Sequence, residues 1–271
     1  MPPTLAQITR ELLAAYNRYP RKNLGQHFLV DPKVVERIIK AAELTKDDLV
    51  IEIGSGLGVV TAEIAAEVNH LIAIEIDKEL VEMSKNVLKD APNITFVAQD
   101  ILKVNFSELA LGRKYKVIGN LPYNITAPIV EKILTTPEKP ELAVIMVQKE
   151  VAERMAATPG TKKYGSFSIF TQYYAKAALL SLVSKSSFHP WPNVSSAIVS
   201  LVPHPSPLFP SLNEKIFFDI VHAAFQQRRK KLRNSLAEFG LEGKGIDLNR
   251  RPEELSLKEF ADLVNSLADQ N

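Results

Sequence analysis

The sequence contains no cysteine among its 271 residues. This absence excludes disulfide bonds, thiolate zinc sites, iron–sulfur clusters and a cysteine nucleophile. Its five histidines are scattered and none has the HExxH spacing, so we expect no metal site. No apolar run approaches the roughly 18 residues needed to cross a bilayer, and the N-terminus lacks the compact apolar stretch of a signal peptide. We therefore expect a cytoplasmic protein without membrane contacts.

The composition is that of a soluble globular protein, with 46% hydrophobic and 24% charged residues. The net charge is only +2, from 33 basic and 31 acidic residues, but its distribution is uneven. No acidic residue lies between Asp219 and Glu238, a stretch that contains the basic run Arg228-Arg229-Lys230-Lys231-Leu232-Arg233. A second, weaker basic cluster comprises Arg18, Arg21 and Lys22. The run at 228–233 is compatible with a solvated helical face, but its density of positive charge favours contact with phosphates.

Short apolar runs alternate with amphipathic ones over the first two-thirds of the chain. The runs predict buried strands at 49–54, 70–76, 94–100, 115–120 and 141–148. Helical patterns separate them, at 32–42, 60–68, 78–88 and 127–134. Strands alternating with helices predict an α/β fold with a doubly wound, mostly parallel sheet, in which ligands bind beyond the carboxyl ends of the strands.

A change of pattern marks a domain boundary. Four prolines within residues 203–210 exclude a helix or a central strand there. Beyond them the pattern is helical, at 214–225, 228–239 and 257–267. We predict an α/β domain over 1–202, with an N-terminal extension 1–22 that packs onto its core, and a small helical domain over 203–271.

A glycine-rich turn follows the first predicted strand, in Glu52-Ile53-Gly54-Ser55-Gly56-Leu57-Gly58. The dinucleotide fingerprint GxGxxG does not fit, because Val59 or Thr61 stands at its third glycine position. A phosphate-binding loop does not fit either, since no Gly-Lys-Ser/Thr follows. The spacing ExGxGxG is instead typical of S-adenosylmethionine-dependent methyltransferases. A strand–turn–helix without a ligand is the alternative.

Two acidic residues follow the next two predicted strands. Glu75 can accept hydrogen bonds from both hydroxyls of a ribose, and Asp100 can accept one from the amino group of an adenine. Ile76 and Ile101 beside them can enclose the base. Either acid alone is compatible with a helix cap or a solvated strand end, but together with the glycine turn they favour a cofactor site.

The tetrapeptide Asn120-Leu121-Pro122-Tyr123 ends the fourth predicted strand. It is the pattern of enzymes that methylate an amino nitrogen conjugated to a ring. The Asn120 side-chain carbonyl and the Leu121 backbone carbonyl can hold the two amine hydrogens and orient the nitrogen lone pair. Pro122 fixes the turn, and Tyr123 can stack on the ring. A plain turn at a strand end is the alternative.

With these motifs the chain resembles the small-subunit ribosomal RNA adenine dimethyltransferase family, a class I methyltransferase domain followed by a small helical domain. Further motifs that carry the resemblance are Asn23–Leu29, Gln148–Arg154, Tyr164–Ser168, Phe188–Ala197 and Arg251–Leu255. The resemblance implies cofactor contacts from Gln26, His27, Leu29, Gly54, Gly56, Glu75, Ile76, Asp100, Ile101 and Asn120. It implies that Phe188 faces Tyr123 across the target base. The sequence departs from the family at His27, where bacterial relatives usually carry Asn.

The resemblance further implies the reaction. Two adjacent adenosines in a hairpin loop near the 3′ end of small-subunit rRNA each receive two methyl groups from S-adenosylmethionine, leaving S-adenosylhomocysteine, and no metal is required. The partner is an immature small ribosomal subunit, and we expect a monomer. Arg228, Arg229, Lys230, Lys231 and Arg233, on a predicted helix of the C-terminal domain, are candidates for RNA docking.

Two related functions remain as alternatives. A sister family methylates one large-subunit rRNA adenine and confers antibiotic resistance; Leu121 and the motif at 188–197 argue against it. A non-catalytic RNA-binding relative would not need Glu75, Asp100, Asn120 and Tyr123.

Overall fold

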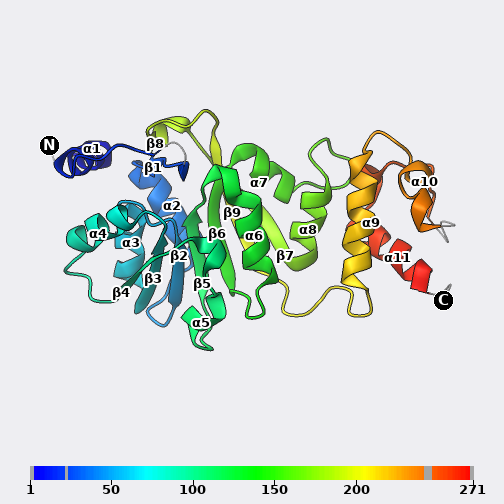
Figure 1. Cartoon of the computed structure of the whole chain (residues 1–271), viewed down its shortest axis with the longest axis horizontal. Coiled ribbons are helices and arrows are strands. Elements are labelled where there is room, and N and C mark those ends of the chain that lie inside the picture. Colours follow the sequence, from blue (N-terminus) through cyan, green and yellow to red (C-terminus); the bar gives the residue numbers. More distant parts are fainter. Residues whose placement is uncertain (1–2, 22–23, 241–245, 269–271) are drawn as a thin grey trace. The chain divides into compact units, whose positions relative to one another are not determined.

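The computed structural model describes residues 3–21, 24–240 and 246–268, so Lys22 of the second basic cluster and Asn23 of the motif at 23–29 lie outside the described residues. The chain divides into two compact units. The first comprises residues 1–152 and 178–203, and the second comprises residues 153–177 and 204–271 (Figure 1).

A seven-stranded sheet forms the centre of the first unit, in the order β4-β3-β2-β5-β6-β9-β7. Its strands are β2 (Leu49–Ile53), β3 (His70–Glu75), β4 (Ile94–Ala98), β5 (Lys116–Asn120), β6 (Leu142–Gln148), β7 (Ala175–Val183) and β9 (Ser196–Pro203). The five neighbouring strands β4, β3, β2, β5 and β6 pair in parallel. The next strand, β9, pairs antiparallel with β6. The predicted mostly parallel α/β sheet is therefore confirmed, and all five predicted strands are present.

Helices cover both faces of this sheet (Figure 1). Helix α3 (Val59–Glu67) joins β2 to β3, and α4 (Lys78–Val87) joins β3 to β4, so both connections run in the same direction along the sheet. Because such crossovers are right-handed, both helices lie on one face. Helix α5 (Phe106–Ala110) lies between β4 and β5, and α6 (Thr126–Thr135) joins β5 to β6. These connections run in the opposite direction along the sheet, so both helices lie on the opposite face. The strand order reverses between β2 and β5, so the loops that follow these two strands diverge around a crevice.

Local sequence signals account for several of these boundaries. Helix α2 (Pro32–Ala42) begins after Asp31, whose side chain accepts a hydrogen bond from the Lys33 backbone N–H at 3.0 Å. Strand β2 is buried along its whole length, as expected for a central parallel strand. A short two-stranded sheet joins β1 (Phe28–Leu29) to β8 (Phe188–His189).

The N-terminal extension packs onto the first unit, as predicted. Helix α1 (Leu5–Ala15) starts at a capping box formed by Thr4 and Gln7. Its Leu13 is 5% exposed and belongs to an apolar cluster with Phe28, Leu57, Leu80 and Met83. The extension therefore contributes to the packing beneath the glycine turn.

The second unit is helical. It contains α8 (Ser166–Tyr174), α9 (Glu214–Gln226), α10 (Leu232–Ser235) and α11 (Leu257–Ala268), while α7 (Lys149–Met155) crosses the boundary between the units. The division differs from the predicted boundary at 202/203, because residues 153–177 belong to the helical unit. The reason is aromatic packing between α8 and α9: the rings of Tyr173 and Phe217 stack with centroids 5.1 Å apart.

The predicted helix over 228–239 is wrong. Helix α9 ends at Gln226, a turn follows, and only Leu232–Ser235 and Ala237–Phe239 are helical. The backbone N–H of Leu232 donates to the carbonyl of Arg250 at 2.9 Å, and that of Arg233 donates to Leu248 at 3.0 Å. These long-range bonds replace the i to i−4 bonds that a continuous helix would require.

In the part of the chain that the structure describes, no helix combines the length and the apolar character that a membrane crossing requires.

Candidate functional site: a crevice at the carboxyl ends of β2, β3 and β5

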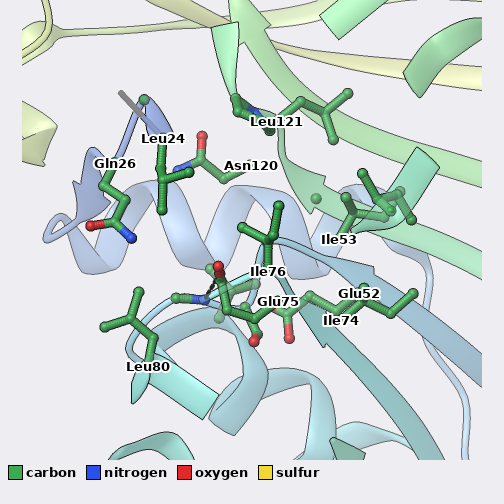
Figure 2. A pocket seen from close by; sticks show the side chains of 18 of the residues that line it. Leu24, Gln26, Glu52, Ile53, Ile74, Glu75, Ile76, Leu80, Asn120 and Leu121 are labelled. Carbon is green, nitrogen blue, oxygen red and sulfur yellow. Dashed lines mark hydrogen bonds between the residues drawn. The ribbon is translucent and has the colours of Figure 1, made fainter. Parts of the chain in front are cut away.

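A cavity of the first unit lies where the sheet order reverses (Figure 2). Segments that follow β2, β3, β4 and β5 line it, together with residues 24–29. Every predicted cofactor-binding residue lines this cavity, as do four of the five predicted catalytic residues: Gln26, His27, Leu29, Gly54, Gly56, Glu75, Ile76, Asp100, Ile101, Asn120, Leu121, Pro122 and Tyr123. Thirteen of the fourteen residues predicted for the cofactor and catalytic sites, all but Phe188, thus lie around one crevice.

The backbone of the glycine turn is left-handed at Gly54 and Gly56. Gly54 has φ of +75°, and a Cβ there would lie 3.3 Å from the backbone oxygen of Asn120. Gly56 has φ of +56°, and a Cβ there would lie 3.4 Å from the Phe28 ring. The left-handed backbone favours glycine at both positions, and the close Asn120 oxygen favours it further at Gly54. The turn therefore exposes main-chain atoms to whatever occupies the crevice.

The Glu75 carboxylate closes the turn from the end of β3. Its Oε2 accepts a hydrogen bond from the Gly56 N–H at 3.0 Å, and its Oε1 accepts one from the Asp77 N–H at 3.0 Å. The side chain is 8% exposed, and this burial raises its pKa against the opposing effect of the backbone donors. Each carboxylate oxygen has a second lone pair, so Glu75 keeps acceptor capacity towards the crevice.

Glu52 is a second buried carboxyl of the crevice that sequence reasoning used only as part of the glycine spacing. Its side chain is 2% exposed and lines the cavity. Burial, with the nearby Glu75 carboxylate acting in the same direction, raises its pKa to about 7. No donor among the described residues bonds its Oε2. The leading position of ExGxGxG was the signal that could have identified it.

Asp100 follows β4 at another side of the crevice. Its Oδ1 accepts a hydrogen bond from the Leu102 N–H at 3.0 Å and so caps the short helical turn Ile101–Lys103. Asp100 is thus a cap and also a cavity residue. The two predicted apolar neighbours differ, since Ile76 is 49% exposed and Ile101 only 7%. In Figure 2, Ile76 stands between Glu75 and Asn120.

Gln26 connects the crevice to the weaker basic cluster. Its Nε2 donates to Asp77 Oδ2 at 3.2 Å, and its Oε1 accepts from the Arg21 backbone N–H at 2.8 Å. The Arg21 guanidinium lies 3.3 Å from Asp77 and 2.9 Å from Glu79, and Arg18 also pairs with Glu79. Both arginines are therefore engaged by carboxylates of the first unit.

Asn120 ends β5 directly above the glycine turn. Its Nδ2 donates to the backbone carbonyl of His27 at 3.1 Å. This bond orients the amide, so that its Oδ1 is the group left to accept a hydrogen bond from a ligand. Because the partner is the His27 carbonyl, the substitution of the usual Asn by His at position 27 does not remove this contact.

The His27 ring faces Tyr123. The two rings are stacked with centroids 5.7 Å apart and an interplanar angle of 25°. His27 Nδ1 lies 2.8 Å from the carbonyl oxygen of Pro190, and the Tyr123 hydroxyl lies 2.6 Å from Ser196 Oγ. Burial raises the pKa of Tyr123, so it is a neutral phenol at ordinary pH. The aromatic wall of the crevice is thus held from both sides.

Phe188 does not occupy its predicted place opposite Tyr123. It is 1% exposed, is absent from the cavity lining and belongs to the apolar core together with Leu29 and Ile198. The alternation of side chains along β8 explains this: Phe188 points into the core and His189 is half-buried. In this structure His27, rather than Phe188, lies against Tyr123.

The basic run lies in the second unit, in the turn after α9 and in α10. Arg229, Lys230, Lys231 and Arg233 are exposed. Arg228 is half-buried, donates to the Thr161 carbonyl at 3.3 Å and lies 3.9 Å from Glu253. Although no acidic residue lies close to the run in sequence, Glu253 lies beside Arg228, and the other four basic side chains are exposed.

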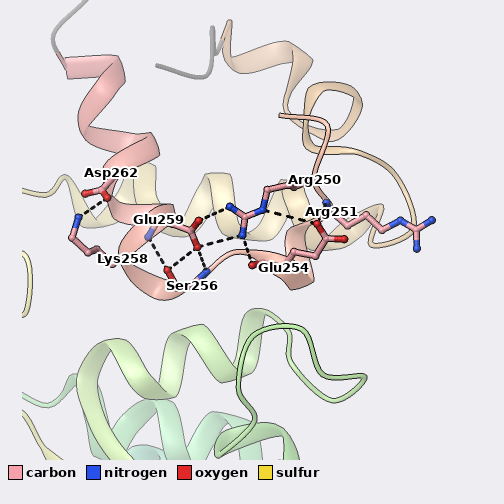
Figure 3. A network of polar contacts seen from close by, with 7 residues as sticks. All are labelled: Arg250, Arg251, Glu254, Ser256, Lys258, Glu259 and Asp262. Carbon is pink, nitrogen blue, oxygen red and sulfur yellow. Dashed lines mark hydrogen bonds and ion pairs between the residues drawn. The ribbon is translucent and has the colours of Figure 1, made fainter. Parts of the chain in front are cut away.

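A polar network supports the chain that runs beneath α10 (Figure 3). Arg250 donates to Glu259 and to the Glu254 carbonyl. Glu259 also accepts from the backbone N–H and hydroxyl of Ser256, at 2.8 and 2.9 Å. These donors, the Arg250 bond foremost, lower the pKa of Glu259 to about 2. The network fixes Arg250, whose own carbonyl accepts from Leu232.

A metal centre finds no support in the side chains that the structure describes, since no three His, Asp or Glu residues are grouped suitably for an ion.

The sheet order, the antiparallel β9 and the glycine turn beside buried acids define a class I methyltransferase. The sequence profile of the family described as ribosomal RNA adenine dimethylase matches residues 17–269. The chain therefore belongs to the ribosomal RNA adenine dimethylase family, and both the family and the enzyme class expected from the sequence are confirmed.

Bacterial relatives extend this match over nearly the whole chain. The chain is 42% identical to ribosomal RNA small subunit methyltransferase A of Pelotomaculum thermopropionicum, covering 97% of this chain and 96% of that protein. It is 41% identical to the protein of the same name from Clostridioides difficile, covering 95% and 94%.

Two solved structures share the fold. A dimethyladenosine transferase from Plasmodium falciparum is 26% identical, with a TM-score of 0.79 over 90% of this chain and 98% of that one. The 23S rRNA methyltransferase ErmE is 25% identical, with a TM-score of 0.72 over 89% and 99%.

Proposed function

We propose that this protein transfers methyl groups from S-adenosylmethionine to the 6-amino groups of two adjacent adenosines in small-subunit rRNA. The observation that carries the proposal is the position of Asn120, whose amide is fixed by the His27 carbonyl beside the glycine turn. Full-length relatives with about 40% identity carry the name small subunit methyltransferase. The family uses S-adenosylmethionine. For this chain, we add the substrate, which is a pair of adjacent adenosines in small-subunit rRNA.

The crevice residues fit this cofactor. The left-handed glycines allow main-chain atoms to approach its methionine end, where Gln26, His27 and Leu29 also lie. Glu75 offers two acceptor lone pairs for the ribose hydroxyls, and Asp100 offers an acceptor for the adenine amino group. Ile76 and Ile101 provide apolar contacts for the base. When bound, the cofactor supplies an electrophilic methyl group on a sulfonium, and S-adenosylhomocysteine remains.

The chain's own residues then orient the substrate amine. Asn120 Oδ1 and the Leu121 carbonyl accept the two amine hydrogens and direct the nitrogen lone pair towards the methyl group. Tyr123 stacks on the adenine ring, with His27 supporting its other face. No strong base is needed before transfer, because the amine proton leaves afterwards. Two transfers to each nitrogen require that the monomethylated amine can be held by its one remaining hydrogen.

The target base must leave its stack to reach Asn120, and a hairpin loop lowers the cost of that step. We assign RNA docking to the second unit, residues 153–177 and 204–271, through Arg229, Lys230, Lys231 and Arg233, with Arg228 in a structural role. The protein acts as a monomer, and its reaction requires no metal.

A methyl-transfer assay tests the function. Purified protein with labelled S-adenosylmethionine should modify small subunits that lack these methyl groups, and mass spectrometry of the digested rRNA should show dimethyladenosine at two adjacent positions. Large-subunit rRNA is the matched control. Methylation of a single large-subunit adenine would support the sister function, and binding without transfer would support a non-catalytic role.

A further inference from the structure

The chain's only tryptophan, Trp191, is strongly exposed. Its side chain is 71% accessible to solvent, between the buried Pro192 and the half-buried Pro190. Tryptophan is highly buried on average, because its large apolar surface is unfavourable in water. An indole held out in this way is suited to stacking on a flat aromatic partner.

The segment that carries Trp191 is attached to the wall of the crevice. His189 pairs with Phe28 in the β1–β8 sheet, which Figure 1 shows beside the N-terminal end of the unit. The next residue, Pro190, contacts His27 Nδ1 through its carbonyl at 2.8 Å. His27 in turn stacks on Tyr123. Trp191 therefore follows directly on a residue that contacts the aromatic wall, although it does not itself line the cavity.

A cation lies beside the same segment. Lys185 is exposed, and its ammonium donates to the carbonyl of Asn193, two residues beyond Trp191. An aromatic plane next to a fixed positive charge matches a single-stranded nucleic acid, in which bases alternate with phosphates. A protein partner could cover the indole and pair the lysine with a carboxylate, but it does not repeat a flat ring next to an anion as a single strand does.

We propose that Trp191 is a stacking platform for an unpaired base next to the target adenosine, with Lys185 contacting the adjoining phosphate. This inference rests on the proposed function. The target base enters the crevice to reach Asn120, so the base on Trp191, outside the cavity, is a neighbour in the same loop. Trp191 is thus a positioning residue for RNA, with no contact to the reacting atoms.

Kinetics with the full-length protein and undermethylated small subunits provide the first test. Trp191→Ala should raise KM for the subunit roughly tenfold, at the lower end of the effects of removing a base-stacking aromatic. The kcat should stay within about twofold, and Trp191→Phe should restore most of the affinity. Leu111→Ala is the matched control, since Leu111 is 82% exposed and precedes the amino end of β5, away from the crevice.

Fluorescence gives a second readout that needs no turnover. Because Trp191 is the sole tryptophan, its emission should be quenched by an RNA hairpin with adjacent loop adenosines and unaffected by a fully paired duplex. Wild-type protein that transfers no methyl group would overturn the proposed function. Active wild-type protein with unquenched emission and an unchanged KM in Trp191→Ala would overturn the stacking role alone, and emission that responds only to ribosomal proteins would assign the surface to a protein partner.

Discussion

The carboxylates of the two units differ in what their surroundings do to them. In the first unit, burial raises the pKa of Glu75 and raises that of Glu52 to about 7. In the second unit, the Arg250 guanidinium and the Ser256 donors lower the pKa of Glu259 to about 2. The charged form is thus disfavoured in the crevice and favoured in the network.

This difference assigns ligand binding to the crevice carboxyl groups of the first unit and fold stability to the Arg250–Glu259 network of the second. In the crevice, burial outweighs the backbone donors that reach Glu75, and the Oε2 of Glu52 has no donor among the described residues, as expected where a ligand completes the hydrogen bonding. The network around Arg250 is formed within the chain, and it fixes Arg250, whose carbonyl accepts a hydrogen bond from Leu232 in the basic run. Substitutions in the crevice should therefore reduce activity or binding while preserving the fold. Substitutions in the network should reduce the stability of the fold while preserving cofactor binding.

The largest expected effect is on transfer. Asn120→Ala removes the acceptor that orients the amine, so single-turnover transfer at saturating cofactor and RNA should fall by roughly 100-fold or more, as when one preorganised catalytic group is removed. Unfolding should be little changed. Asn124→Ala is the matched control, because Asn124 is exposed and does not line the cavity. Transfer by Asn120→Ala within about twofold of wild type would refute the positioning role.

The next effect concerns the stability of the free protein. The Glu52 carboxyl has a pKa of about 7 in the fold against 4.5 as its ordinary value. The folded state then binds more protons than the unfolded state between these values, so stability should fall as pH rises from about 4.5 to about 7. The difference in unfolding free energy between wild type and Glu52→Gln should change by about 3 kcal/mol over this range.

Chemical denaturation at a series of pH values, followed by circular dichroism, measures this difference. Glu63→Gln serves as control, since Glu63 is exposed on the neighbouring helix α3. If wild type and Glu52→Gln had parallel pH profiles of stability, the fold would not raise the pKa of Glu52, and the proposed difference between the carboxylates of the two units would be refuted.

Cofactor affinity should change by a smaller amount. Asp100→Ala removes a charged acceptor and should weaken S-adenosylmethionine binding by roughly 1.5–3 kcal/mol, measured by calorimetry. Asp100 also caps the turn that follows, so Asp100→Asn is the informative partner: asparagine keeps the cap but presents an N–H₂ group to the adenine amine. Weak binding by both variants supports adenine recognition, whereas loss in Asp100→Ala alone would assign Asp100 to the cap.

Much of the crevice could be predicted because its signals are local. The apolar runs of β2 to β6 and the turn residues that follow them lie within a few positions of each other, and parallel strands bring their carboxyl ends together. Strand β7 was missed because it is not a continuous apolar run: most of its residues are half-buried or exposed. Strand β9 was not predicted as a strand; the motif at 188–197 covers only its first two residues.

Long-range contacts decided the features that could not be predicted. The helix over 228–239 has suitable residues, but Leu232 and Arg233 bond to the distant Arg250 and Leu248. Phe188 belongs to a motif of the site, yet pairing of β8 with β1 turns its ring into the core. Residue type was informative at these positions, and orientation was set by partners at least 15 residues away in sequence.

RNA docking is expected to respond to charge rather than to shape. Replacing Arg229, Lys230 and Lys231 with Ala should reduce the slope of log affinity against log salt by about two units, at about 0.7 per phosphate on single strands. Cofactor affinity should be unaffected, because these residues lie in the other unit. Replacing the exposed Lys89, Arg113 and Lys114, near the amino ends of β4 and β5, controls for net charge. An unchanged slope would show that RNA docks elsewhere.

The smallest effect tests the network. Glu259 has a pKa of about 2 in the fold against an ordinary value of 4.5, so the stability that its charge contributes is complete above pH 4.5 and is lost as pH falls towards 2. Its side chain is 34% exposed, so we discount for solvent screening and expect Glu259→Gln to lose about 1 kcal/mol at pH 7. Glu254→Gln is the control, since the Glu254 carboxylate lies 3.9 Å from Arg250. Denaturation between pH 7 and pH 2 should show a smaller loss of stability in Glu259→Gln than in wild type, because the other carboxylates titrate in both proteins. This difference is opposite in sign to the trend for Glu52. A trend of the same sign at both residues would mean that the carboxylates of the two units do not differ in kind.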